Sequence, residues 1–258
     1  MLVRHQKNDD NNNQLTTEAF YDYAKHVFDY AVESILNAED DYTKPYQNQN
    51  RVPTTCLFKS RVIVNEKLVD AVFADQYINA NGFVMPNGVR YYLTQTPIPT
   101  ETDAKFWFMI AQIRANAIVF LCGEDEVSKS EDIVIKKEQY GGYFPRRVNK
   151  TLKFSNGVEV TNVRCKYRRS KGVTVDTDRG LFEELPNGQE NTVWKFSHSF
   201  EHYTYIGWSK DTPPLNTEHI RKMMSLLKNV KRVVVHCSDG AGRSGTFAGK
   251  QHFGSAYL

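Results

Sequence analysis

One segment constrains this chain more than any other, because a valine-rich run leads directly into a glycine-containing loop. It reads VVVHCSDGAGRSGT from Val233 to Thr246. The valines predict a short buried strand. Gly240 and Gly242 allow consecutive backbone N–H groups to turn inward without Cβ clashes, which forms a concave nest for a tetrahedral dianion. A helix that starts after the loop adds the positive end of its dipole. The segment therefore predicts an anion-binding loop between a strand and a helix.

Three side chains of this loop predict chemistry on the bound anion. Arg243 carries a planar fork that binds two phosphate oxygens at once. Cys237 lies at the focus of the positive field, which stabilises its thiolate and makes it a nucleophile. Ser244 follows the arginine, where its hydroxyl is placed to hydrogen-bond the sulfur and assist its release in a second step. The expected phosphate-binding residues are Ser238, Asp239, Gly240, Ala241, Gly242 and Arg243.

The remaining cysteines predict neither a metal site nor a disulfide scaffold. Cys56, Cys122 and Cys165 lie far apart without a CxxC pair, and free cysteines of this kind are usually small core residues. We expect a reducing, cytoplasmic compartment. We expect no metal or organic cofactor, because the loop itself supplies the positive field. His236 is expected to be a buried supporting residue rather than the general base, since the loop already ionises the thiol.

Composition argues against several broad classes of function. The chain has 258 residues, of which 40% are hydrophobic and 24% are charged, ordinary values for a globular protein with a sizeable core. Its 33 Lys and Arg residues against 30 Asp and Glu residues give a net charge of +3, which does not indicate a dedicated nucleic-acid binder. The longest apolar stretch, residues 117–122, is too short to cross a bilayer. We expect a monomer with no membrane span and no secretory signal.

The pattern along the chain predicts a polar, disordered lead-in over residues 1–16 and one α/β domain over residues 17–258. Apolar residues at helical spacing predict helices over 17–39 and 102–114, and a third helix with Thr217 as its cap. Expected strands are 61–64, 71–73, 90–94, 117–122, 133–135, 233–235 and a pair within 152–166 that turns at Asn156-Gly157. Residues 166–190 are charged and are expected to form an irregular surface excursion. The basic residues there that would suit an anionic surface, or simply face solvent, are Arg164, Lys166, Arg168, Arg169 and Lys171.

Together with other segments, this loop resembles that of the cysteine-dependent protein tyrosine phosphatases, and the resemblance covers nearly the whole chain after the lead-in. The matching segments are Asn50-Arg51, Tyr77 to Asn81, Tyr92 to Pro97, Phe106-Trp107, Tyr143 to Pro145, His202 to Trp208, and Pro214. The resemblance implies an α/β fold in which a twisted mixed sheet is flanked by helices. It also implies hydrolysis of phosphotyrosine in proteins through a cysteinyl-phosphate intermediate. Structural rather than catalytic roles are expected for Tyr77, Asn79, Gln95, Phe106 and Trp107.

The family's acid loop, Trp-Pro-Asp, has a different sequence here. The corresponding residues are Trp208-Ser209-Lys210, which put lysine where the family has the aspartate that protonates the leaving group. Asp211 follows one residue later, and a shift of the loop by one residue would present it instead. The resemblance therefore implies Asp211 as the general acid. If Asp211 is instead a solvated loop carboxylate, the acid is Lys210, a poor match for this role, or is absent.

Three further departures from the family bear on activity. Val52 replaces the tyrosine that stacks on the substrate ring, and Asp239 replaces an alanine of the phosphate loop. A negative charge beside a dianion opposes binding unless it faces outward or pairs with a cation, and we expect Asp239 to face outward. Gln251 comes too early to be the glutamine that orients the hydrolytic water, so the sequence is either a fragment or a shortened domain.

These departures leave two rival functions open beside hydrolysis of a phosphotyrosine protein. A phosphotyrosine-binding pseudophosphatase would keep the phosphate loop without the acid, the stacking tyrosine and the glutamine. A phosphoinositide phosphatase is suggested by the Cys-Ser-Asp-Gly sequence from Cys237, which resembles the loop of myotubularin-like lipid phosphatases, and by Val52.

Overall fold

The computed structural model describes residues 44–52, 61–64, 73, 75–85, 87–123, 126, 142–145, 147–154, 158–170, 173–184 and 197–254. Several expectations lie outside these residues. They are the lead-in, the helix over 17–39, most of strand 71–73, strand 133–135, the Asn156-Gly157 turn and the environment of Cys56. Among the described helices, none is long and apolar enough to cross a membrane.

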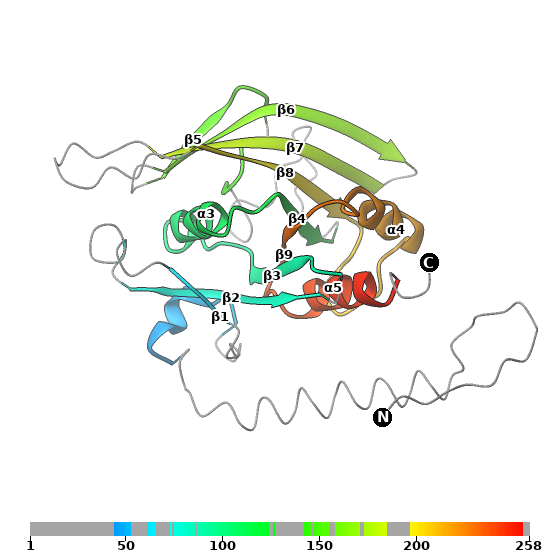
Figure 1. Ribbon diagram of the computed structural model, residues 1–258, viewed down its shortest axis with the longest axis horizontal. Coiled ribbons are helices and arrows are strands. Elements are labelled where there is room, and N and C mark those ends of the chain that lie inside the picture. The colour runs from blue at the N-terminus through cyan, green and yellow to red at the C-terminus, as the bar shows by residue number, and fades with distance from the viewer. Residues whose placement is uncertain are drawn as a thin grey trace, which may run out of the picture.

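Within the described residues, one nine-stranded sheet runs through the molecule in the order β1-β2-β3-β9-β4-β8-β7-β6-β5 (Figure 1). Its strands are β1 (Arg61–Ile63), β2 (Tyr77–Val84), β3 (Arg90–Gln95), β4 (Ala117–Cys122), β5 (Thr151–Lys153), β6 (Val158–Ser170), β7 (Val173–Glu184), β8 (Ser197–Ile206) and β9 (Arg232–Cys237). The central strands β3, β9, β4 and β8 are parallel neighbours, whereas the outer pairs are antiparallel. The sheet is therefore mixed, as expected.

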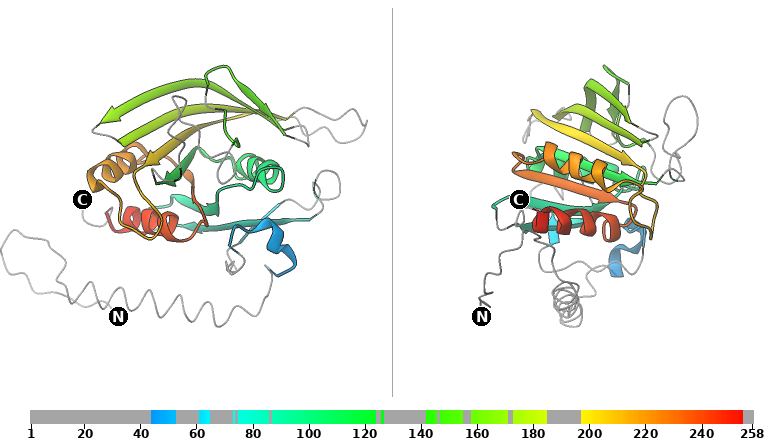
Figure 2. Two further views of the ribbon diagram at one scale, coloured as in Figure 1. Left: turned by 180° about the vertical axis from the view of Figure 1, so that it is seen from behind. Right: turned by 90° about the vertical axis from the view of Figure 1, so that its right-hand side faces the viewer.

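Helices cover both faces of the central strands, which explains why β4 is apolar along its whole length. α3 (Asp103–Gln112) lies on one face, in a core cluster with Ile118 and Val234. α4 (Thr217–Leu226) and α5 (Gly242–Gly254) lie side by side on the other face, where they pack with Val119 and Val235 (Figure 2). Alternate residues of each strand thus enter opposite cores. A short 3-10 helix, η1 (Lys44–Gln49), contacts β2.

Within the range 166–190, the described residues 166–170 and 173–184 form strands and not the irregular excursion that their charge suggested. β6 and β7 form a long antiparallel ribbon, paired from Val158 opposite Glu184 to Ser170 opposite Val173. β7 also pairs with β8, so the ribbon continues the main sheet. The run from Val173 to Thr177 is rich in β-branched residues, and an antiparallel strand needs only one apolar face. High charge alone was therefore a misleading signal.

The remaining expected elements agree with the structure, with small shifts at their ends. Strands 90–94 and 117–122 and helix 102–114 correspond to β3, β4 and α3, and β9 extends the expected strand as far as the cysteine. The cap of α4 is Asn216 rather than Thr217. The Asn216 side chain accepts from the N–H groups of Glu218 at 2.9 Å and His219 at 3.3 Å, so Thr217 becomes the first helical residue.

Candidate active site

The loop between β9 and α5 lies where three parallel strands end together. β9 pairs with β3 on one side and with β4 on the other, so Cys237 is opposite Gln95 and His236 is opposite Phe120. In α/β sheets, ligands bind outside the carboxyl ends of such strands. α5 starts at Gly242, so its positive N-terminus lies at the same end. The strand, loop and helix predicted from the sequence are confirmed.

Gly240 allows the loop to pass close to β3. Its φ is +78°, a region that residues with a Cβ atom rarely adopt. A Cβ atom added there would lie 2.4 Å from the carbonyl carbon of Thr94 and 2.6 Å from the nitrogen of Gln95. At Gly242 an added Cβ would meet nothing within 4 Å. Close packing therefore requires glycine at the first of these two positions only.

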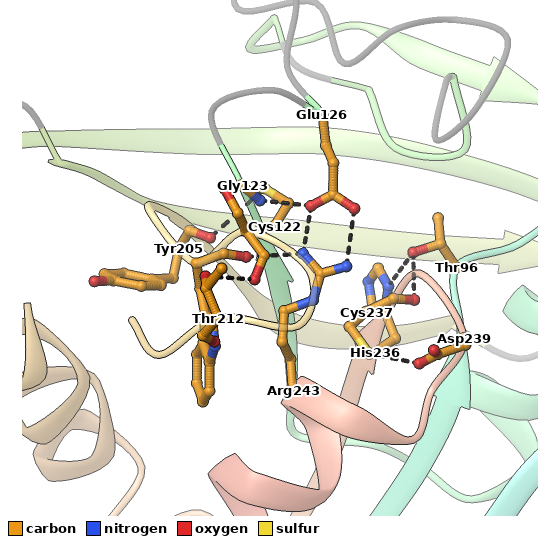
Figure 3. A network of polar contacts seen from close by, with 12 residues as sticks. Thr96, Cys122, Gly123, Glu126, Tyr205, Thr212, His236, Cys237, Asp239 and Arg243 are labelled. Carbon is orange, nitrogen blue, oxygen red and sulfur yellow. Dashed lines mark hydrogen bonds and ion pairs between the residues drawn. The ribbon is translucent and has the colours of Figure 1, made fainter. Parts of the chain in front are cut away.

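Arg243 is held by a buried carboxylate (Figure 3). Its Nη2 donates to Glu126 Oε1 at 2.8 Å, and its Nη1 donates both to Glu126 Oε2 and, at 2.8 Å, to the carbonyl oxygen of Trp208. Burial opposes the charged form of Arg243, but the hydrogen bonds and the charge of Glu126 raise its pKa above the ordinary value. The guanidinium is therefore charged, and its plane is fixed.

Glu126 is a site residue that reasoning from the sequence missed. It follows the end of β4, where it also accepts from the N–H of Gly123 at 2.5 Å. β4 and β9 are parallel neighbours, so their carboxyl ends meet, and Glu126 reaches an arginine 117 positions later. The sequence did contain one signal, an acidic residue just after the apolar strand 117–122. A carboxylate that is buried at such a place needs a cationic partner.

Cys237 and Asp239 are in direct contact (Figure 3). The buried Cys237 Sγ donates to Asp239 Oδ1 at 3.4 Å, and the same oxygen accepts from the N–H of Ala241 at 3.0 Å. The expected outward orientation of Asp239 is therefore wrong, since the loop N–H groups offer this carboxylate nearby donors. Burial opposes its ionisation, but these hydrogen bonds and the charge of Lys210 hold the pKa of Asp239 below its ordinary value.

Ser244 lies at the expected place without making the expected contact. Its side chain is fully buried, and among the described residues its Oγ has no hydrogen-bond partner. The sulfur of Cys237 donates to Asp239 instead. The hydrogen bond that was predicted between Ser244 and the sulfur is thus not formed in this structure.

A chain of buried polar groups supports the loop from beneath. Thr96 donates through Oγ1 to the carbonyl oxygen of Cys237 at 2.8 Å and contacts His236 Nδ1 at 3.1 Å. The hydroxyl of Tyr143 lies 2.7 Å from His236 Nε2 and 2.8 Å from His202 Nε2. Because the single Thr96 hydroxyl proton goes to the carbonyl, Nδ1 of His236 is the donor to Thr96. The hydroxyl of Tyr143 then donates to Nε2 of a neutral His236.

His236 is neutral for a clear physical reason. Complete burial lowers its pKa well below the ordinary value, and the charges of His202, Arg51 and Arg243 lower it further. This agrees with the supporting role expected for His236. In the described part of the chain, no group of three His, Cys, Asp or Glu side chains is arranged to hold a metal ion.

Comparison with known proteins decides the family. Residues 46–252 match the family model described as protein-tyrosine phosphatase. The chain belongs to the protein-tyrosine phosphatase family. It is 30% identical over 178 residues to tyrosine-protein phosphatase 2 of Dictyostelium discoideum and 30% identical over 176 residues to human tyrosine-protein phosphatase non-receptor type 13. Each match covers 66% of this chain, but only 40% and 6% of the respective relatives.

A solved structure, described as the structural basis of the PTPN18 fingerprint on distinct HER2 tyrosine phosphorylation sites, has the same fold. The two structures superpose with a TM-score of 0.68 at 18% identity, over 95% of this chain and 80% of the other. This likeness confirms the expected tyrosine phosphatase architecture of a twisted mixed sheet with flanking helices.

The segment that corresponds to the family's acid loop is anchored at its first residues. The N–H groups of Gly207 and Trp208 both donate to the carbonyl oxygen of Cys122 at 3.0 Å. Trp208 is buried, its carbonyl accepts from Arg243, and its Nε1 donates to the carbonyl oxygen of Thr212 at 2.7 Å. The loop is therefore tied to the phosphate loop through one backbone carbonyl.

The two candidates for the acid lie further along this loop, and both are exposed. Asp211 has a φ of +58°, a left-handed conformation that is uncommon for residues other than glycine. Among the described residues, no hydrogen bond or ion pair joins its carboxylate to the phosphate loop. Lys210 is close enough to Asp239 for its charge to stabilise that carboxylate. The structure therefore brings Lys210, rather than Asp211, into electrostatic contact with the loop.

The start of the phosphotyrosine loop is tied to β3. The N–H of Arg51 donates to Gln95 Oε1 at 2.9 Å, and its guanidinium donates to the carbonyl oxygens of Thr96 and Pro97, each at 2.6 Å. Gln95 donates in turn to the carbonyl oxygen of Gln49 at 2.7 Å. Since Thr96 also bonds Cys237, these contacts connect the phosphotyrosine loop to the nucleophile strand.

The residues expected to be structural are buried and support the same region. Tyr77 and Asn79 donate to Asn50 Oδ1 at 2.5 Å and 2.7 Å, which fixes the residue before Arg51. Trp107 donates through Nε1 to the carbonyl oxygen of Tyr143 at 2.9 Å. These contacts agree with the structural roles expected for Tyr77, Asn79 and Trp107.

Proposed function

We propose that this domain hydrolyses phosphotyrosine in proteins through a cysteinyl-phosphate intermediate. The observation that carries the proposal is the convergence of Cys237, the loop N–H groups and the charged Arg243 at the carboxyl end of β9. Preorganised donors of this kind stabilise the charge that develops on phosphoryl oxygens. The cysteine usage supports action in the cytoplasm.

The reaction proceeds in two displacements. In the first, the Cys237 thiolate attacks phosphorus in line, the bond from phosphorus to the tyrosine oxygen breaks, and that oxygen takes up a proton. In the second, water attacks phosphorus and loses a proton, the phosphorus–sulfur bond breaks, and inorganic phosphate leaves. The backbone of residues 238–243 and the guanidinium of Arg243 bind the equatorial oxygens, and Ser244 donates to the thiolate that departs.

A general acid is needed most where the leaving group is poor, as it is for tyrosine. We assign this role to Asp211, which is exposed on the acid loop. The alternative is that Lys210 marks a lost acid. In that case the domain binds phosphotyrosine and turns it over poorly. The position of Lys210, whose charge acts on the phosphate loop at Asp239, favours this second candidate function.

The test is turnover and binding of a phosphotyrosine peptide by the wild-type chain and by Cys237→Ser. We expect wild-type release of phosphate and a Ser variant that retains peptide binding but has no turnover, because its loop donors and Arg243 remain. Wild-type turnover by the Ser variant would contradict the covalent mechanism. Binding without turnover by the wild-type chain would instead establish the binding function.

A further inference from the structure

Asp239 is an anion inside a loop built to bind anions. Its Oδ1 accepts the N–H of Ala241 at 3.0 Å and the thiol of Cys237 at 3.4 Å. The N–H of Gly242 is a further donor to this carboxylate. Both backbone donors belong to the set expected to bind the phosphate. The Asp239 side chain is half-buried, whereas Ala241 and Gly242 are exposed.

The state of the nucleophile is consistent with an internal ligand. Attack on phosphorus requires the thiolate, and a thiolate cannot donate to Asp239, so attack and this contact exclude each other. The neighbouring Ser244 hydroxyl is fully buried and has no hydrogen-bond partner among the described residues. A thiolate at Cys237 would supply the acceptor that this hydroxyl lacks. Asp239 therefore holds the sulfur in a contact that the reaction must break.

We propose that the Asp239 carboxylate is an internal competitor for the phosphate loop, which weakens binding of phosphoryl dianions and engages the sulfur of Cys237 in a hydrogen bond. This regulation rests on the proposed function, because it acts on the same loop. A phosphoryl group enters when Asp239 turns away from the N–H of Ala241 and from the sulfur. Lys210, on the acid loop, is the cation that stabilises the Asp239 carboxylate. Lys210 and Asp239 both depart from the family pattern, and each therefore affects the other.

Two variants separate the charge of Asp239 from its place in the loop. Asp239→Asn keeps the size of the side chain and an oxygen that accepts from the N–H of Ala241, but removes the negative charge. Asp239→Ala removes both. The matched control is Glu159→Gln, which removes one carboxylate from β6. This strand lies next to the edge strand β5 and is separated from β9 by β4, β8 and β7. Glu159 pairs there with Lys153, whose side chain is 72% exposed.

The experiment measures binding of inorganic phosphate to the four full-length chains by calorimetry, with thermal melting as a check on folding. We expect Asp239→Asn and Asp239→Ala to bind phosphate at least tenfold more tightly than wild type, about 1.4 kcal/mol, and the control to match wild type. A second readout is the rate of Cys237 alkylation by neutral iodoacetamide, followed by mass spectrometry. This rate should rise in both Asp239 variants.

The outcomes distinguish this proposal from the proposed function. Equal and measurable phosphate affinities in wild type and both variants would overturn the competitor role, while leaving the phosphate loop and its chemistry intact. Loss of affinity in both folded variants would also overturn it, because Asp239 would then support the loop. No phosphate binding by any of the four chains would remove the proposed function together with this inference.

Discussion

At the scale of single residues, the Arg243–Glu126 pair places two buried charges directly behind the phosphate loop. The two side chains bond to each other, Glu126 also accepts from the N–H of Gly123, and Arg243 also donates to the carbonyl oxygen of Trp208. A buried pair of this kind is worth little against an apolar replacement, but removing one partner leaves an uncompensated charge. The pair therefore gives Arg243 a fixed orientation, and its integrity is expected to limit both folding and turnover.

Glu126→Gln should lower the free energy of unfolding by about 3 kcal/mol, because the Arg243 guanidinium remains buried without its counter-charge. Turnover should fall as well, since the fork loses its orientation. Urea denaturation and phosphatase assays measure the two effects. The control is Glu159→Gln, whose partner Lys153 is exposed, and which should change stability by less than about 1 kcal/mol. Equal effects of the two substitutions would show that burial of the site pair is unimportant.

The glycine at position 240 leads to a second residue-scale prediction. Gly240→Ala forces a Cβ atom to within 2.4 Å of the Thr94 backbone at a φ of +78°, so the loop must move away from β3. We expect a loss of stability of about 2 kcal/mol or more and loss of phosphate binding. Gly249→Ala, in α5 with nothing within 4 Å, should be neutral or stabilising by up to about 1 kcal/mol. If Gly240→Ala left denaturation and phosphate binding unchanged, the close approach to β3 would not matter.

At the scale of elements, the acid loop is fixed at Trp208 and exposed beyond it. The fixed part holds Arg243, whereas the exposed part carries both candidates for proton donation. If Asp211 is the acid, Asp211→Asn should slow turnover of a phosphotyrosine peptide by about a hundredfold. It should slow an activated aryl phosphate much less, because that leaving group needs little protonation. Equal rates for wild type and variant on both substrates would show that Asp211 takes no part.

Because Lys210 stabilises Asp239, a substitution in the acid loop also affects the phosphate loop. Lys210→Asp restores a carboxyl group at the family's position, but it also removes the cation that stabilises Asp239. Two carboxylates would then meet beside a phosphoryl dianion, so we expect no gain in phosphotyrosine turnover from this change alone. Combined with Asp239→Ala, it should raise turnover at least tenfold, about 1.4 kcal/mol of barrier. Additive effects of the two substitutions would contradict the coupling between the loops.

At the scale of the whole molecule, the sequence predicts those parts whose cause is local. The apolar strand over residues 117–122, the helix over 102–114 and the loop from Cys237 to Arg243 each carry their pattern within a short window, and all three are present. β7 was missed because its pairing with β6 and β8 outweighs its charge. Glu126 was missed because its role depends on the side-by-side placement of β4 and β9, which no local pattern contains.

The orientation of the Asp239 side chain also could not be predicted from the sequence. The expectation of an outward carboxylate was based on repulsion from a phosphate dianion. The structure offers this side chain the N–H of Ala241 and the thiol of Cys237, and these donors turn it inward. The anion-binding role of the loop was thus predictable from its residues. The contact of Asp239 with donors of the same loop was not.

Global stability should depend on pH through His236, which is buried as the neutral form. Its pKa in the folded state lies well below 6.5, so below that pH the unfolded chain binds a proton that the folded chain does not. The free energy of unfolding should therefore fall as the solution is acidified from pH 6.5, with a contribution of up to about 1.4 kcal/mol per pH unit. Denaturant unfolding at several pH values measures this slope. His236→Asn keeps a donor for Thr96 and does not titrate, so it should lose that part of the slope. Identical slopes for the two proteins would show that His236 is not the group that couples acid to unfolding.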